Sequence, residues 1–169
     1  VATYMVEGGS SRDFMAVKAW ALRAPEEFNQ LIDIIIISTV EYLVAQVKAG
    51  ADIIQIFDSW AGALSADQFT RWVIEPTRAM VEKIRIQCPG VPIIGFPRGA
   101  GVLYQDYVRE TTVDCVSVDS SVPTEWAATS LLPHCTVQGN LDPITLLVGG
   151  KPMLDAAGKI LRSFADGAH

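Results

Sequence analysis

Short apolar runs alternate with amphipathic segments along the whole chain. Five of these runs are rich in β-branched and aliphatic residues and have the length of strands; they span residues 1–6, 53–57, 91–96, 115–118 and 134–137. The runs are nearly all apolar rather than alternating, which is typical of parallel strands that are buried on both faces. The pattern therefore predicts five strands of a parallel sheet.

A helix is predicted after each of these strands. The predicted helices span residues 13–23, 25–49, 65–87, 103–110 and 124–132, with a short helix from residue 143 and a last one from residue 152. Pro25 and Pro143 suit the first turn of a helix, Asp142 suits an N-cap, and Gly50 suits a C-terminal stop. We expect Gly167 to end the last helix.

The segment 65–87 carries two further signals. Ser65 and Gln68 have the S-x-x-Q spacing of a capping box, which predicts a helix N-terminus. Pro76 lies inside the same segment and lacks a backbone N–H, so we expect it to kink or divide the helix.

Strands that alternate with helices indicate an α/β fold, for which two architectures compete. A doubly wound sheet predicts a G-x-G-x-x-G loop after its first strand, and the Gly-Gly-Ser-Ser of residues 8–11 does not match it. A (β/α)8 TIM barrel predicts polar residues at many strand ends, as found here, but takes about 200 residues or more. We therefore expect residues 1–169 to be a single domain of about five consecutive β/α units, a partial barrel that lacks N-terminal and C-terminal units.

Composition and charge exclude several classes of protein and of binding partner. The chain has 169 residues, of which 50% are hydrophobic and 19% charged, which excludes a disordered segment. Its net charge of −6 and the absence of a Lys/Arg run argue against nucleic-acid binding. Cys88, Cys115 and Cys135 are far apart and lack CxxC spacing, so they are interpreted as buried thiols, not disulfides, of a reducing, cytoplasmic compartment.

The most apolar stretch of the chain spans residues 31–47 and contains four consecutive isoleucines. Asp33, Glu41 and Gln46 interrupt it, and the uninterrupted run is far shorter than the about 18 residues of a membrane-spanning helix. No signal-peptide pattern opens the chain. We therefore expect no membrane association.

Polar residues stand at or just beyond the carboxyl ends of the predicted strands, where a barrel has its active site. They are Tyr4, Glu7, Asp58, Ser59, Arg98, Asp119, Gln138 and Asn140. This is a hydrogen-bonding set, without the crowding of His, Cys and carboxylates that marks a metal centre. The residues alone therefore predict a small-molecule enzyme with a hydrogen-bonding, carboxylate-binding mouth, and they do not name its reaction.

Each of the main candidates has an alternative interpretation. Tyr4 can donate its phenol to a substrate carboxylate, or it can fill the barrel with its hydroxyl bound to a neighbour. Ser59 can bind an anion or cap a turn. Arg98 can clamp a carboxylate, or it can form a salt bridge with Asp58 or Asp119.

The remaining polar candidates are interpreted mainly as structural. Asp58 and Asp119 can act as acid/base groups, but aspartates that cap loops are commoner. Gln138 and Asn140 are expected to tie the loop before Asp142. His134 stands at the start of a predicted strand, at the end of the barrel opposite the active-site mouth.

Three strings of the sequence resemble the uroporphyrinogen decarboxylase family. They are Thr-Tyr-Met-Val-Glu-Gly-Gly at 3–9, Gln-Ile-Phe-Asp-Ser-Trp-Ala-Gly at 55–62 and Gln-Gly-Asn-Leu-Asp-Pro at 138–143. The string Gly-Phe-Pro-Arg-Gly at 95–99 is similar to the bacterial form. The resemblance runs over residues 1–169 in the family's order, as roughly the middle half of a family chain.

The resemblance implies a (β/α)8 barrel, usually a homodimer, that converts uroporphyrinogen III to coproporphyrinogen III by removing four acetate carboxyls. It also implies that no metal or organic cofactor takes part. Tyr4 and Ser59 match residues that contact the substrate in the family, and Phe57 would pack on the macrocycle. Arg98 is our own addition to the family's substrate-binding set, as a carboxylate contact.

No catalytic residue is assigned with this resemblance. The family's N-terminal arginines and its aspartate for the pyrrole NH groups would precede Val1, and its Gly-His-Gly histidine would follow His169. Two alternatives remain. The related cobamide-dependent methyltransferases bind zinc through a His-x-Cys pair near residues 94–98, where this chain has no such ligands. A non-catalytic half-barrel that acts as a binding or dimerisation module is the second.

Overall fold

The computed structural model describes residues 1–9 and 11–165, so the helix end expected at Gly167 lies outside the described residues. The strands are β1 (Ile54–Asp58), β2 (Ile93–Pro97), β3 (Cys115–Ser117) and β4 (Thr136–Gln138). The α-helices are α1 (Ala2–Glu7), α2 (Met15–Arg23), α3 (Pro25–Lys48), α4 (Ala66–Phe69), α5 (Glu75–Gln87), α6 (Tyr104–Thr111), α7 (Thr124–Ser130), α8 (Pro143–Val148) and α9 (Gly150–Ala165).

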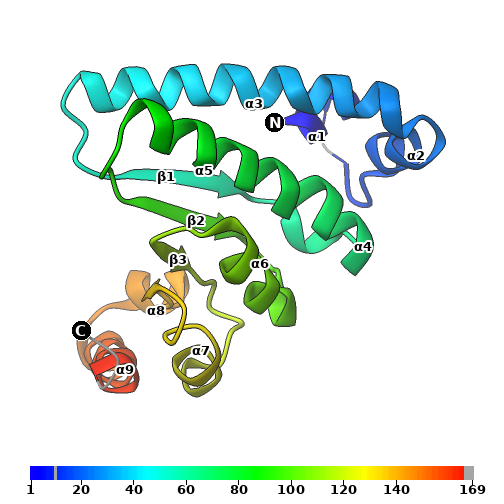
Figure 1. Ribbon diagram of the computed structural model, residues 1–169. Coiled ribbons are helices and arrows are strands. Elements are labelled where there is room, and N and C mark those ends of the chain that lie inside the picture. Colours follow the sequence, from blue (N-terminus) through cyan, green and yellow to red (C-terminus); the bar gives the residue numbers. More distant parts are fainter. Residues whose placement is uncertain (10, 166–169) are drawn as a thin grey trace.

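The four strands in the described part of the chain form one parallel sheet in the order β1-β2-β3-β4. Spatial order follows chain order without the reversal that defines a doubly wound sheet. Helices α3 and α5 run along the same side of β1 and β2, and the later helices continue around the sheet (Figure 1). The structure therefore confirms the predicted α/β fold and has the winding of a partial (β/α)8 barrel.

The first predicted strand is wrong, because the segment predicted at residues 1–6 forms helix α1 (Ala2–Glu7). Gly8 ends this helix in a left-handed conformation, with φ of 66°, and donates its N–H to the carbonyl of Tyr4 at 3.2 Å. The carboxylate of Glu7 then accepts the N–H of Val17 in the first turn of α2 at 3.0 Å. A six-residue apolar run has no periodicity that separates strand from helix, and here contacts with the following helices decide.

The two faces of the sheet differ in exposure. One face packs against helices and carries the buried positions Ile54, Ile56, Ile93, Gly95, Val116 and Val137, which the strand register places side by side. The opposite face carries Gln55, Phe57, Ile94, Phe96, Cys115, Thr136 and Gln138, which are half-buried or exposed, together with the buried Ser117. This second face corresponds to the interior of a barrel, and it ends at the candidate site.

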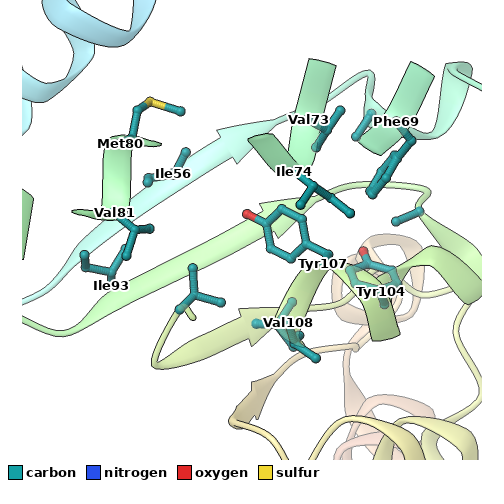
Figure 2. Packing of buried hydrophobic residues seen from close by; sticks show 14 of the residues in the cluster. Ile56, Phe69, Val73, Ile74, Met80, Val81, Ile93, Tyr104, Tyr107 and Val108 are labelled. Carbon is teal, nitrogen blue, oxygen red and sulfur yellow. The ribbon is translucent and has the colours of Figure 1, made fainter. Parts of the chain in front are cut away.

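The core between sheet and helices is aliphatic and aromatic. Figure 2 shows Val81 of α5 facing Ile93 of β2, and Tyr107 of α6 lying beside Ile74. Val81, Ile93 and Ile74 are fully buried and Tyr107 is 1% exposed. A side chain at Gly95 would collide with the Tyr107 ring and hydroxyl, so the glycine makes room for the tyrosine. This core supports the strand ends from behind.

The helical segment after Ser65 continues without a break past Pro76, but its hydrogen-bonding pattern changes before the proline. Residues between α4 and α5 form a π-helical turn, Thr70–Ile74, directly before the turn that contains the proline. The capping box is not formed, because Ser65 makes no side-chain cap bond and Gln68 instead accepts a hydrogen bond from the indole of Trp72 at 2.7 Å. A side-chain partner one helical turn away outcompetes the expected cap.

Two other terminal signals act as predicted. Asp142 caps α8 by accepting the N–H groups of Ile144 and Thr145 at 2.5 and 3.1 Å. Helix α3 ends at Lys48, and Gly50 follows with φ of 109°. These local signals need no tertiary partner, which is why the sequence carries them.

Helix α3 is long and apolar enough by composition to cross a membrane, contrary to the expectation from its interrupted isoleucine run. A mostly buried core helix of a soluble protein passes the same test. In α3 one row, which includes Phe28, Ile36 and Val40, packs in the core, and 28% of the apolar window is buried. The finding is weak evidence for a membrane span.

The three cysteines are free thiols in the structure, and the prediction that they are buried holds for Cys88 but is wrong for the other two. Cys88 is buried, and Cys115 and Cys135 are half-buried. Burial raises the pKa of Cys135 to about 12, and the neighbouring Cys115 adds to the shift. This thiol therefore stays protonated at neutral pH and is a poor nucleophile.

Candidate active site

The carboxyl ends of the strands meet at one edge of the sheet, and backbone hydrogen bonds join the loops that follow them. The Arg98 N–H donates to the carbonyl of Asp58 at 3.0 Å, and the Gly62 N–H donates to the carbonyl of Arg98 at 3.0 Å. The Val118 N–H donates to the carbonyl of Gln138 at 2.9 Å. The loops that carry the candidate residues are therefore held against one another.

Tyr4 reaches this edge from helix α1 rather than from a strand end. Its hydroxyl oxygen accepts a hydrogen bond from the indole N–H of Trp60 at 3.0 Å, across 56 residues of sequence. The side chain is otherwise 61% exposed, and its own O–H remains available to donate. Because Trp60 directly follows Ser59, this bond brings the phenol to the loop that carries the serine.

Two further contacts fix Trp60, one through its ring and one through its backbone. Its ring packs on Phe14 with centroids 4.9 Å apart, and its backbone N–H donates to the carboxylate of Asp58 at 3.3 Å. Trp60 was not among the candidate residues selected from the sequence, yet it links Tyr4 to the loop after β1. Only the pairing of two distant segments reveals this link.

Phe57 and Phe96 form an aromatic pair on the open face of the sheet. They are register partners on β1 and β2, and their ring centroids are 6.0 Å apart. Phe57 is 66% exposed and Phe96 is half-buried. The pair offers a flat apolar ligand a surface directly below the strand ends, and sequence reasoning had selected only Phe57.

Arg98 is exposed just beyond the end of β2. Its side chain makes no ion pair with any residue that the structure describes, so the alternative of a bridge to Asp58 or Asp119 is not realised. Burial raises the pKa of Asp58, whose carboxylate turns to the backbone of Trp60. The guanidinium is therefore free to meet an anion from solution.

The carboxylate of Asp119 accepts more hydrogen bonds than an aspartate that only caps a loop. Its Oδ2 accepts the N–H of Gly99 at 2.8 Å and the hydroxyl of Tyr104 at 3.1 Å. Its Oδ1 accepts the backbone N–H of Ser121 at 3.1 Å and also the Ser121 hydroxyl. Burial alone would raise the pKa of Asp119, but these donors outweigh it and lower the pKa, so the group is a carboxylate at neutral pH.

Asn140 links the last two loops. Its side-chain amide donates to the carbonyls of Asp119 and Val122 at 3.0 and 2.6 Å. The amide therefore ties the loop before Asp142, as expected for Asn140, by anchoring it to the loop after β3. Gln138, with its backbone in the ladder, leaves its side chain exposed.

The opposite end of the sheet carries a different set of polar residues. Asp114 precedes β3 and accepts the N–H of Ile93 at 2.8 Å and the guanidinium of Arg85 at 3.1 Å. His134 precedes β4 and accepts the Nε–H of Arg109 at 3.4 Å. The predicted position of His134, away from the active-site end, is confirmed.

An apolar cavity of about 380 Å³ lies on the helix side of β1. Its lining is mostly aliphatic and aromatic and includes Phe28, Ile36, Ile56, Trp72 and Met80. Such a lining does not suit a ligand with many carboxylates. Phe57, Asp58 and Trp60 also line the cavity, so it adjoins the strand-end site although most of its lining is apolar.

Comparison with known proteins identifies the family of this chain. A family model described as uroporphyrinogen decarboxylase matches residues 1–169. This chain belongs to the uroporphyrinogen decarboxylase family. The match confirms the resemblance carried by the three strings, and the parallel sheet agrees with a partial barrel of this family.

Curated members of the uroporphyrinogen decarboxylase family align over nearly the whole chain. Uroporphyrinogen decarboxylase of Rhodospirillum rubrum is 52% identical over 167 residues, which are 99% of this chain and 48% of that protein. The enzymes of Erythrobacter litoralis and Rhizorhabdus wittichii are each 46% identical over 169 residues, covering 50% and 49% of those proteins. The chain thus spans about half the length of these relatives.

Proposed function

We propose that this chain is part of a uroporphyrinogen decarboxylase, which removes the four acetate carboxyls of uroporphyrinogen III to give coproporphyrinogen III in tetrapyrrole biosynthesis. One observation carries the proposal for the site. The Trp60 indole joins the Tyr4 hydroxyl to the loop of Ser59, so residues from two of the family's strings meet at the strand ends. Residues 1–169 are a single domain in this proposal, a partial barrel completed by further units.

The chemistry requires an electron sink. Protonation of a pyrrole carbon makes the ring cationic; the bond from the acetate methylene to its carboxylate then breaks, CO2 leaves, and the electron pair passes into the ring. A proton is then added to the exocyclic methylene, which becomes a methyl group, and the proton first placed on the ring carbon is released, which restores the neutral pyrrole. The protein must hold a polyanionic macrocycle, stabilise the developing cation and deliver protons.

The described residues supply the binding part of this chemistry. Phe57 contacts the apolar face of the macrocycle, with Phe96 beside it. The free O–H of Tyr4 and the hydroxyl of Ser59 donate hydrogen bonds to substrate, and Arg98 pairs with a substrate carboxylate. No catalytic acid is assigned among these residues, and no metal or organic cofactor takes part.

The partners follow from the same proposal. The ligand is a small polyanionic molecule, and the complete protein is a cytoplasmic homodimer. The net charge of −6 and the scattered Lys and Arg residues support the exclusion of nucleic acid. The charged residues Asp33 and Glu41 within the apolar stretch of α3 support the exclusion of a membrane span.

The test uses purified complete protein that contains residues 1–169, with its intact mass measured on the same sample. Anaerobic incubation with uroporphyrinogen III should yield coproporphyrinogen III through products with seven, six and five carboxyls. Saturable binding of uroporphyrinogen without any decarboxylated product would overturn the proposal and favour the non-catalytic binding module. Size-exclusion chromatography with light scattering checks the homodimer.

A further inference from the structure

The loops after β1, β2, β3 and β4 are joined around a single carboxylate. Asp119, after β3, binds the Gly99 N–H of the loop after β2, and its own carbonyl accepts the amide of Asn140 after β4. The Arg98 carbonyl, next to Gly99, accepts the N–H of Gly62 in the loop after β1. A hydrogen-bonded path therefore runs from Asp119 to both loops that carry the proposed substrate contacts.

The loops after β1 and β2 are in direct backbone contact at Gly62 and Gly99. A Cβ at Gly62 would overlap the carbonyl of Gly99, so the two backbones lie directly against each other. A shift of Gly99 toward Gly62 must therefore displace Gly62, and with it the segment that follows Ser59. Asp119 fixes Gly99 from the other side, through its N–H.

A buried tyrosine anchors the carboxylate. Tyr104 of α6 is fully buried, and its hydroxyl donates a hydrogen bond to the carboxylate of Asp119 at 3.1 Å. Burial raises the pKa of Tyr104, and the negative charge of Asp119 raises it further, so the phenol remains a donor at all physiological pH values. The rigid core of the domain thereby sets the position of an exposed loop.

The donors also determine what Asp119 does not do. Gly99 and Tyr104 occupy Oδ2, and Ser121 occupies Oδ1. A carboxylate saturated in this way repels a polyanionic ligand less than a bare one and is poorly placed to exchange a proton with it. Its contribution is geometric.

We propose that Asp119 is a positioning residue that holds the loops after β1 and β2 in register, so that Arg98 and Ser59 face the substrate together. The inference rests on the proposed function for what these loops bind. It extends the site to Tyr104 and Gly99, which contact no substrate in this scheme.

The chain offers a matched control at the other end of the same strand. Asp114 precedes β3 as Asp119 follows it, and it too accepts a backbone N–H from the β2 region together with a side-chain donor. Asp114→Asn perturbs a comparable set of bonds far from Arg98 and Ser59. A general loss of stability would affect both variants alike.

The experiment compares Asp119→Asn and Asp114→Asn in the complete protein. An amide has one acceptor oxygen, so Asp119→Asn must abandon either the Gly99–Tyr104 side or the Ser121 side. We expect KM for uroporphyrinogen to rise about tenfold with kcat changed less than about twofold, and amide exchange at Gly99 and Gly62 to accelerate. Asp114→Asn should accelerate exchange at Ile93 and leave KM within about twofold.

Tyr104→Phe provides a second, milder variant that keeps the Gly99 bond. It removes a single donor and should raise KM about threefold, without affecting Ile93 exchange. Unchanged exchange at Gly99 in Asp119→Asn, or an equal rise of KM in both aspartate variants, overturns the inference. Absence of decarboxylation in the unmodified protein would overturn the proposed function instead, and the exchange rates would still decide whether Asp119 holds the loops.

Discussion

The two ends of the sheet use charged residues in opposite ways. At the amino ends of the strands, Arg85 pairs with Asp114, and Arg109 contacts His134. At the carboxyl ends, Asp119 is bound by neutral donors, and the guanidinium of Arg98 has no ion-pair partner among the described residues. At the amino ends the arginines bind partners within the protein. At the carboxyl ends the carboxylate and the guanidinium do not pair, which leaves the guanidinium available for a ligand.

Aromatic residues differ between the two faces of the sheet. Tyr107 is buried behind the strands, while Phe57 lies exposed on the open face at the strand ends. Exposed aromatic rings beside an unpaired cation suit a flat molecule with an apolar centre and an anionic rim. The comparison suggests that the carboxyl end is organised for binding and the amino end for stability, and the following variants test this division.

The largest effect on stability is expected at Tyr107, in the core that supports the whole sheet. Tyr107→Ala should lower the free energy of unfolding by about 3–5 kcal/mol, because it leaves a cavity against Gly95 and Phe69. Urea denaturation measures this loss. Ile86→Ala, at a side chain 81% exposed on α5, is the control and should change stability by less than about 0.5 kcal/mol. Equal losses in the two variants would contradict the assigned core.

The next effect separates the arginines of the two ends. Arg98→Gln should raise KM for uroporphyrinogen about 10-fold or more, since a charge-assisted bond to a carboxylate is lost, with little change in the urea midpoint. Arg85→Gln should show the reverse, a lower midpoint at unchanged KM, because its partners are Asp114 and the carbonyl of Thr112. If Arg85→Gln weakens substrate binding as much as Arg98→Gln, the division between the ends is wrong.

Smaller changes are expected at the hydroxyls. Tyr4→Phe and Ser59→Ala each remove one hydroxyl and should lower kcat/KM about fivefold while the fold stays intact, as circular dichroism would show. Trp60→Phe keeps an aromatic ring on Phe14 but removes the donor to Tyr4. Its effect should resemble that of Tyr4→Phe. Wild-type turnover in both Tyr4→Phe and Ser59→Ala would show that these residues do not contact the substrate.

The smallest effect distinguishes two aspartates of the carboxyl end by their pH dependence. Burial raises the pKa of Asp58, so its ionisation opposes folding, and this cost grows as pH rises through the folded-state pKa. Asp58→Asn should therefore raise the urea midpoint slightly at pH 7 and lose this advantage below the ordinary aspartate pKa of about 3.9.

Asp119 should show the opposite sign. Its pKa is lowered in the folded protein, so its contribution to stability is present above about pH 3.9 and disappears as the pH falls through the folded-state pKa. Asp119→Asn should therefore lower the midpoint at pH 7, and its difference from wild type should shrink in acid. Parallel pH profiles for the two variants would contradict the assigned environments.

Local signals in the sequence were enough for most of the framework. The apolar runs at 53–57, 91–96, 115–118 and 134–137 correspond to β1 to β4 within a few residues, and Asp142 caps its helix as expected. Because carboxyl ends of parallel strands share one edge, the sequence also placed Ser59 and Arg98 at the same edge. These inferences need only neighbours along the chain and the geometry of a parallel sheet.

Contacts between distant segments settled the rest. Residues 1–6 are too short a run to show a period, and packing makes them a helix. Asp119 looked like a loop cap until the sheet brought Gly99 and Tyr104, 20 and 15 residues away, to its carboxylate. Trp60 meets Tyr4 across 56 residues. Hydrogen bonds over such separations depend on how helices cross the sheet, and no local pattern in the sequence encodes that crossing.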